Sequence, residues 1–179
     1  VLIKGNYFLP NATGKAYSWI FSSGTSSNFH VTITDNKFEE SYDHAIYCTG
    51  MFHSVVANNT VHGAANSALK TTGTDNVIAN NYCGSAGIEI NNGSRNIVAN
   101  NIIDNYRSVA LINYAYGIDG SFTDNIIEGN FIRGNSAGGA CEAIRCWGLT
   151  VSGTKITGNT IINADTPTCG RGVIVVYSS

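Results

Sequence analysis

The sequence predicts an all-β fold, a right-handed parallel β-helix solenoid of about seven turns with three short strands per turn. The phrase NVIANN (76–81) returns as NIVANN (96–101), and its relatives recur at intervals of 20 to 30 residues, too short for paired helices. Between them, β-branched and aromatic residues alternate with a period of two and are bounded by Gly, Asn and Ser, which indicates strands and turns. The phrase ends in an asparagine each time, at Asn6, Asn36, Asn59, Asn81, Asn101, Asn130 and Asn159.

Each turn is expected to contain a longer strand, a Gly or Asn corner, the VIANN-like strand and a short third strand such as residues 82–83. Parallel pairing would stack successive turns about 4.8 Å apart. We expect the terminal asparagine to occupy a corner in left-handed backbone, with its amide bonded to the amides above and below, which is a structural role. The longer strands are residues 18–24, 44–50, 67–73, 86–93, 109–115, 142–148 and 172–178.

The 179 residues are expected to form a single domain. Residues 9–17 and 104–125 interrupt the repeat and are interpreted as insertions or loops, the second of which either adds a rung or projects outward. A strand pattern starts at Val1 and another ends the chain, with no capping helix between pattern and terminus. We therefore expect a segment of a longer solenoid, or ends that another chain covers.

Composition excludes several function classes. Charged residues are 12 % of the chain, the net charge is −2 and no basic run occurs, which argues against a nucleic-acid partner. No stretch of 18 apolar residues occurs, so no membrane insertion is expected. The five cysteines form no CxxC pair, which disfavours zinc or redox sites, and Cys141 with Cys169 is the pair to test for a disulfide.

The longer strands predict the outward-facing residues. If Ile20, Ile46, Leu69 and their equivalents point inward, each following residue points outward, because strand side chains alternate between faces. A first outer column then reads Phe21, Tyr47, Lys70, Glu89, Ile112, Arg145 and Val175. A second outer column reads Ser23, Thr49, Thr72, Asn91, Tyr114, Trp147 and Tyr177.

These columns predict a shallow groove. Tyr47, Lys70 and Glu89 would lie within about 10 Å on three successive turns. Arg145 would lie two turns beyond Glu89, with Trp147 beside it. Aromatic rings stack on sugars and cations pair with uronate carboxylates, so an acidic polysaccharide is the expected ligand. The alternative is a Lys70–Glu89 ion pair on a solvated face.

Two other chemistries use acids or bases near this groove. His44 is a candidate base because Asp43 and Tyr47 flank it, although a single histidine is more often a packed residue. A hydrolase needs two carboxylates separated by about 5 Å, or by about 6.5–9.5 Å. The paired-aspartate motif of the polygalacturonases is absent. The carboxylate candidates are Asp35, Glu39, Glu40, Asp43, Glu89, Asp104, Asp119, Asp124, Glu128 and Glu142.

The stretch ALKTTGTDNVIANNYCGSAGIEINNGSRNIVANN (68–101) resembles the core of polysaccharide lyases of the chondroitinase-B and alginate-lyase type. The resemblance implies that Lys70, which opens the Lys-Thr-Thr phrase, is the base that removes the proton α to the uronate carboxylate. It also implies an assisting arginine one turn later and a calcium ion. Asn91 occupies the arginine's place here, and Arg95 is the nearest arginine.

The sequence thus predicts a β-helix protein acting on an acidic polysaccharide, as a lyase first and a hydrolase second. Lys70, Glu89, Arg145, Tyr47 and His44 are the catalytic candidates. The substrate-binding candidates are Trp147, Asn91 and Arg95. The alternative function is a non-catalytic glycan-binding shaft of a phage tailspike or surface adhesin, compatible with a homotrimer. Both functions predict an extracellular or virion-surface location.

Overall fold

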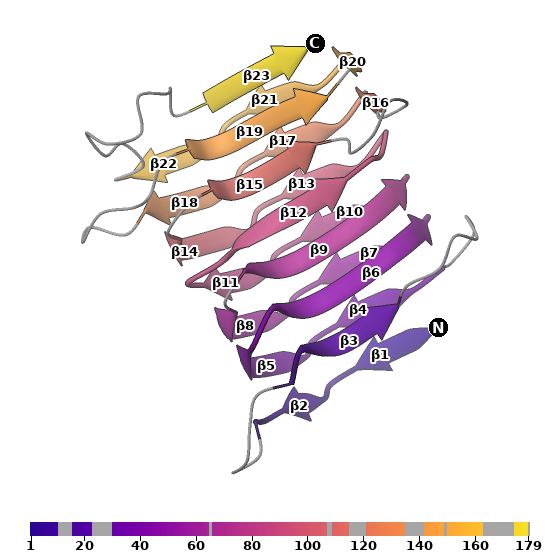
Figure 1. The fold of residues 1–179 in the computed structure, drawn as a ribbon, viewed down its shortest axis with the longest axis vertical. Helices are drawn as coiled ribbons and strands as arrows, with labels where there is room; N and C mark the ends of the chain where they lie inside the picture. Colours follow the sequence, from indigo (N-terminus) through magenta and orange to yellow (C-terminus); the bar gives the residue numbers. More distant parts are fainter. Residues whose placement is uncertain are drawn as a thin grey trace.

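The fold is a parallel β-helix, which confirms the predicted fold class (Figure 1). The computed structural model describes residues 1–10, 16–22, 30–64, 66–106, 109–114, 121–134, 142–148, 150–162 and 174–178. Three parallel sheets of seven strands each run along the axis, so the described residues form seven turns. These residues include no helix long and apolar enough to cross a membrane.

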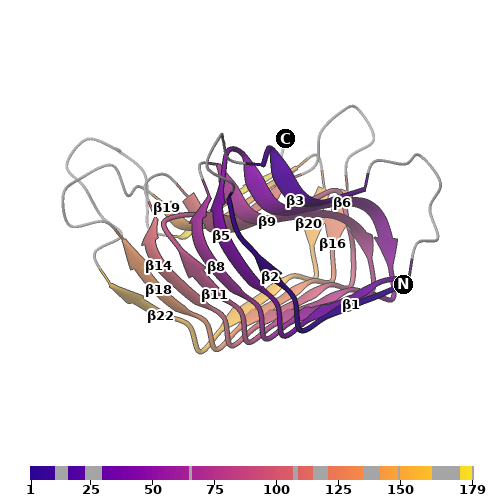
Figure 2. The same ribbon diagram turned by 90° about the horizontal axis from the view of Figure 1, so that it is seen from below.

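Each turn passes through the three sheets in the same order, as the view along the axis shows (Figure 2). The first sheet contains β1 (Leu2–Lys4), β4 (Thr32–Thr34), β7 (Val55–Ala57), β10 (Val77–Ala79), β13 (Ile97–Ala99), β17 (Ile126–Glu128) and β21 (Lys155–Thr157). The second sheet contains β2 (Tyr7–Phe8), β5 (Lys37–Ser41), β8 (Thr60–Ala64), β11 (Tyr82–Gly84), β14 (Ile102–Tyr106), β18 (Phe131–Gly134) and β22 (Thr160–Ile162). The third sheet contains β3 (Ser18–Ser22), β6 (His44–Phe52), β9 (Ser67–Thr74), β12 (Gly87–Asn91), β15 (Val109–Tyr114), β19 (Glu142–Gly148) and β23 (Ile174–Ser178).

Of the two segments expected to interrupt the repeat, residues 9–17 and 104–125, the structure describes different parts. Residues 104–125 include the end of β14, all of β15 and a short strand β16 (Ser121–Thr123), so this segment contributes strands to a turn. β16 pairs with β20 (Thr150–Ser152) in a separate two-stranded sheet. Residues 115–120, and residues 11–15 of the segment 9–17, lie outside the described residues.

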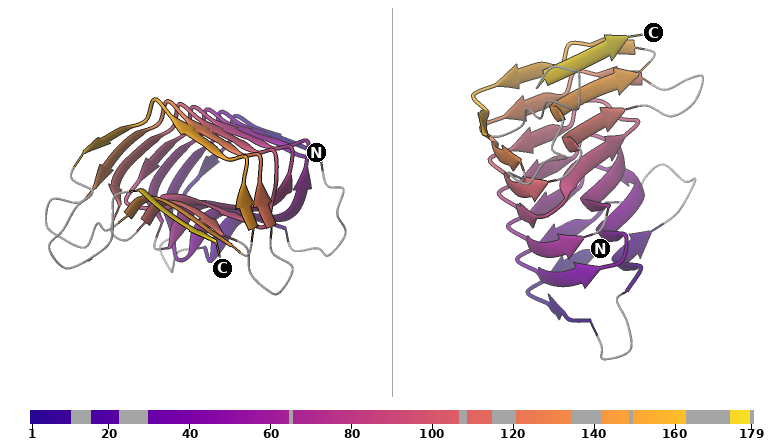
Figure 3. Two further views of the ribbon diagram at one scale, coloured as in Figure 1. Left: turned by 90° about the horizontal axis from the view of Figure 1, so that it is seen from above. Right: turned by 60° about the vertical axis from the view of Figure 1, so that its left-hand side comes forward.

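The predicted strand phase of the third sheet is confirmed. Ile46 pairs in register with Ile20 on one side and Leu69 on the other, and the same inward column continues through Ile88 and Ile144. The first sheet contributes a parallel column through Ile33, Val56 and Ile78, and the second a column through Phe38, Val61 and Cys83. These inward residues form one continuous apolar core along the axis. Figure 3 shows the sheets surrounding this axis, with the strands of each sheet stacked turn upon turn.

A ladder of asparagine amides joins the turns at the corner between the first and second sheets, as predicted. In its middle, Asn81 Nδ2 donates to Asn101 Oδ1 at 3.0 Å, and Asn101 Nδ2 donates to Asn130 Oδ1 at 3.0 Å. The same donor group also satisfies a core carbonyl, Ile78 O in the case of Asn101. The ladder therefore pairs buried backbone groups that the tight corner would otherwise leave without partners. It runs through Asn6, Asn36, Asn59, Asn81, Asn101, Asn130 and Asn159.

The expectation of left-handed backbone at the ladder asparagines is wrong by one residue. The left-handed φ belongs to the residue just before each of them, for example Asn80 at 56° and Asn100 at 54°. That residue turns the chain outward, so the following amide points into the corner, where it meets its neighbours. Because the turning residue faces solvent, its identity varies. The set is Gly5, Asp35, Asn58, Asn80, Asn100, Gly129 and Gly158.

A second ladder, not predicted from the sequence, lies at the corner that precedes the first sheet. Asn76 Nδ2 donates to Asn96 Oδ1 at 3.0 Å, and the backbone N–H of Asn96 donates to Asn125 Oδ1 at 2.9 Å. Ser54 N–H donates to Asn76 Oδ1 at 3.0 Å and extends the ladder by one turn. Each member lies five positions before a residue of the first ladder, so one short strand separates two buried polar columns.

We predict that Asn101→Ala lowers the free energy of unfolding by about 3 kcal/mol or more, since it leaves several buried donors and acceptors unpaired. Urea denaturation measures the change. The matched control is the neighbouring Asn100→Gly, which keeps the exposed left-handed corner and should cost less than about 0.5 kcal/mol. Equal losses for the two variants would contradict a structural role for the ladder.

Candidate active site

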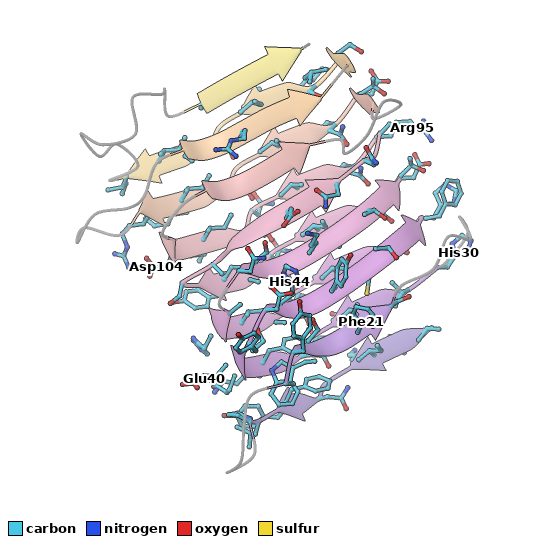
Figure 4. All side chains as sticks on the ribbon, in the orientation of Figure 1. Phe21, His30, Glu40, His44, Arg95 and Asp104 are labelled. Carbon is cyan, nitrogen blue, oxygen red and sulfur yellow. The ribbon has the colours of Figure 1, made fainter. Side chains whose placement is uncertain are left out.

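The outer face of the third sheet carries the predicted column. Lys70 pairs in register with Tyr47 on one side and Glu89 on the other, and Glu89 pairs with Ile112. Arg145 follows Ile112, so it lies two register steps beyond Glu89. His44, also on this sheet, lies near the middle of the molecule in Figure 4.

Lys70 and Glu89 form an ion pair, with Lys70 Nζ 3.0 Å from Glu89 Oε1. The cross-strand ion pair of the alternative interpretation is therefore present, but its side chains are 17 % and 4 % exposed, so it does not lie on a solvated face. A buried ion pair gains little net stability, because both charges lose their hydration. In a chain with so few charges, such a pair on an outer sheet face is a candidate functional site.

Ser67 connects this pair to a histidine. The Ser67 hydroxyl donates to Glu89 Oε2 at 2.9 Å, and the Ser67 carbonyl lies 3.3 Å from His44 Nδ1. His44 Nε2 lies 3.2 Å from Asp43 Oδ2. One polar chain thus runs from Asp43 through His44, Ser67 and Glu89 to Lys70, across three neighbouring strands of the third sheet and the residue before β6.

His44 is buried between two acceptors, the Asp43 carboxylate and the Ser67 carbonyl. A neutral imidazole donates to only one of them, whereas the imidazolium donates to both. Burial lowers the pKa of His44 and Lys70 lowers it further, whereas Asp43 opposes the shift. Asp43 also accepts a hydrogen bond from Tyr17, which raises the pKa of that phenol.

An aromatic surface covers one side of the cluster. The Tyr47 ring lies 5.3 Å from the Phe21 ring and 5.2 Å from the His44 ring, measured between centroids. Lys70 Nζ lies 5.6 Å from the Tyr47 centroid, in cation–π range. Phe21 is 56 % exposed, so this aromatic side opens to solvent.

Asn91 follows two positions after Glu89 on the same face of β12. The residue is 7 % exposed, and its Oδ1 has no hydrogen-bond partner among the residues that the structure describes. A buried amide oxygen without a partner is unusual, and it is a candidate to accept a hydrogen bond from a ligand.

The remaining predicted residues lie further away. Arg145 is half-buried, about 10 Å along the axis from Glu89. Trp147 pairs in register with Tyr114, in the column that contains Asn91, and its side chain is outside the description. Arg95 lies at the corner after β12, where Nε and Nη2 each donate to Asp75 at 2.7 Å, and Figure 4 places it at the edge of the sheet.

The calcium ion that the resemblance implies does not fit the donors of this cluster. Asp43 accepts from Tyr17 and lies against His44, and Glu89 is held by Lys70 and Ser67. No group of three or more His, Cys, Asp or Glu in the described part of the chain could hold a metal ion. Of the carboxylates considered for a hydrolase, Asp43 and Glu89 belong to this cluster.

Cysteine chemistry does not contribute to this cluster. Cys48 and Cys83 are buried in the core, and burial raises the pKa of each thiol to about 12. Cys146 is also a buried free thiol. Cys141 and Cys169, the pair selected for a disulfide test, lie outside the described residues.

Comparison with known proteins identifies the family. A family model described as the right-handed β-helix region matches residues 18–179. The chain belongs to the right-handed β-helix family. Searches of curated proteins and of solved structures found no match. The resemblance of residues 68–101 to polysaccharide lyases therefore has no support from a relative.

Sequence reasoning missed Ser67 and the contact between His44 and Glu89 that it provides. The signal was available, because the alignment of the longer strands places Ser67 beside His44, one turn apart. Serine at such a position is also common on any solvated strand, so nothing in the sequence alone distinguished it.

Within the β-helix, we predict that Lys70→Met lowers the free energy of unfolding by about 3 kcal/mol, because it leaves the buried Glu89 carboxylate without its cation. The double variant Lys70→Met/Glu89→Leu should recover most of that loss, since no charge remains buried. Urea denaturation of the single and double variants measures the coupling. Additive losses would show that the two side chains do not interact.

We also predict that the stability of the β-helix falls as the pH drops below about 6.5, the ordinary histidine pKa. Since the pKa of folded His44 is lowered, the unfolded chain binds the extra proton first, and acid therefore favours unfolding. His44→Gln should remove this component from a series of denaturation curves. His53→Gln, at a side chain 58 % exposed, should leave it in place.

Proposed function

We propose that the outer face of the third sheet binds an acidic polysaccharide and cleaves it as a lyase. One observation carries the proposal, the buried contact of Lys70 with Glu89 beside the Tyr47 ring. In this proposal Lys70 is the proton acceptor, Glu89 the proton store and Tyr47 the phenol, and they belong to three successive strands of the third sheet.

The surroundings favour a uronate-containing chain. Phe21 and Tyr47 offer rings on which sugars stack. Arg145, two turns from Glu89, is at the right separation to meet the carboxylate of a neighbouring sugar of the same chain. The unpartnered Oδ1 of Asn91 supplies an acceptor for a sugar hydroxyl. The backbone of Trp147 shares the register column of Asn91.

The proposed reaction is a β-elimination that consumes no water. A proton passed from Lys70 to Glu89 across their 3.0 Å contact leaves a neutral amine. That amine takes the proton at C5, α to the uronate carboxylate, while the C4–O4 bond breaks and a C4=C5 double bond forms. The Tyr47 hydroxyl protonates the departing O4, and Lys70 then returns a proton to the phenolate through solvent. His44 packs against Tyr47 and holds the ring in place.

The second candidate function is glycan binding without cleavage, as in the shaft of a tailspike or adhesin. The observation that favours it is the same ion pair, because Lys70 Nζ is already engaged by Glu89 Oε1 at 3.0 Å. In this case Lys70 attracts the polysaccharide as a charge. Both functions agree with an extracellular or virion-surface location, and the homotrimer remains a prediction of the shaft alone.

The test is incubation with alginate, chondroitin sulfate and polygalacturonate while the ultraviolet absorbance of the C4=C5 double bond is followed. We expect product from at least one substrate, a loss of about hundredfold or more for Lys70→Ala and for Tyr47→Phe, and little change for the distant Arg95→Ala. New reducing ends without absorbance would identify a hydrolase instead. Retention of the polysaccharide without any product would establish the binding function.

A further inference from the structure

We infer that the outer face of the second sheet is a separate binding surface for a neutral glycan chain. Its centre is Tyr82 on β11, between His62 on the preceding turn and Asp104 with Arg133 on the following turns. This face belongs to the second sheet, whereas the Lys70 cluster lies on the third sheet. The inference does not rest on the proposed lyase function.

Gly84 makes room for the Tyr82 ring. Along one outer column of the second sheet, Gly84 pairs in register with His62 and with Asp104. A Cβ atom at Gly84 would lie 3.2 Å from Tyr82 Cε1 and 3.4 Å from its hydroxyl oxygen. The Tyr82 ring therefore occupies the place of the missing side chain and continues the column. It lies over the strand instead of projecting into solvent.

Polar planar groups flank this ring on both sides. The His62 ring lies 5.3 Å from the Tyr82 ring, centroid to centroid. On the other side, Arg133 Nε and Nη2 donate to the two oxygens of Asp104 at 2.7 and 2.6 Å. The hydrogen bond that Arg133 donates to Asp104 raises the pKa of Arg133, and the nearby Tyr82 hydroxyl contributes in the same direction. Figure 4 shows Asp104 at the edge of the molecule, away from His44.

Further rings follow the same sheet. Tyr7, Tyr82 and Phe131 belong to one outer column, which also contains Lys37 and Ile102. Tyr7 is 55 % exposed. A strand spacing of about 4.8 Å is close to the length of one sugar residue, so a chain lying along the axis would meet successive turns with successive sugars.

The charges on this face select against an acidic ligand. Lys37 pairs with Glu39 at 2.9 Å and Arg133 pairs with Asp104, so these four charges cancel. A surface without net positive charge offers uronates no attraction. The Asp104 carboxylate accepts hydrogen bonds and the Arg133 guanidinium beside it donates them, so the pair can bond to sugar hydroxyls in both directions. The Tyr82 ring can stack on the apolar face of a pyranose.

The test is calorimetric titration with cellohexaose, xylohexaose and mannohexaose, with trigalacturonate as the acidic comparison. We expect at least one neutral oligosaccharide to bind, and Tyr82→Ala to weaken it about tenfold. Tyr82→Phe keeps the ring and should retain most of the affinity. Gly84→Ala should weaken binding less than Tyr82→Ala does, because its methyl group shifts the ring by only a few tenths of an ångström while the backbone conformation remains allowed.

Two matched controls complete the design. Leu2→Ala removes an exposed apolar side chain from the first sheet, off this face, and should change affinity by less than about twofold. Lys70→Ala should leave neutral-glycan binding unchanged, which separates this surface from the proposed active site. Thermal melting confirms that each variant is folded. Binding of trigalacturonate alone, no binding of any neutral oligosaccharide, or equal losses for Tyr82→Ala and Leu2→Ala would overturn the inference.

Discussion

The buried amide ladder is the interaction on which the rest of this β-helix depends. A solenoid corner must reverse the chain within one or two residues, which leaves N–H and C=O groups facing the core. Each ladder asparagine, such as Asn81, accepts from the turn before and donates to the turn after, so its geometry is satisfied only when adjacent turns are in register. The first ladder therefore fixes the register after every strand of the first sheet, and the second ladder fixes it before β7, β10, β13 and β17.

Because the register is fixed, residues that are one repeat apart in the sequence become neighbours on adjacent strands. Tyr47, Lys70 and Glu89 are about twenty residues apart in sequence yet adjacent on the sheet. The inward positions are held by the core and the corners by the ladders, so chemistry can vary only at the outward positions. A buried ion pair at such a position lowers stability relative to an apolar pair of similar size, which is why its occurrence favours function over folding.

The sequence predicted the ladder and the strand phase because both are periodic properties, repeated in every turn. It did not identify which residue adopts the left-handed backbone, since Asn80 and Asn81 are both asparagine. The other corners contain the answer, because Gly5 and Asp35 also precede ladder residues while the ladder position itself never changes. The burial of Glu89 and its bond to Ser67 depend on side-chain orientations between turns, and a single strand's pattern has no information on these.

The second and third sheets show how one backbone repeat supports two chemically different surfaces. On the third sheet the outward column places Lys70 against Glu89 within a buried cluster, so its charges are coupled to Ser67 and His44. On the second sheet the ion pair of Arg133 with Asp104 is more exposed and lies beside a tyrosine ring that rests on glycine. The two outward columns lie on different sheets, and inward residues of both sheets pack in the core between them. Substitutions at outward positions of one sheet therefore leave the core positions unchanged, so the two proposed surfaces can differ in chemistry on one backbone repeat.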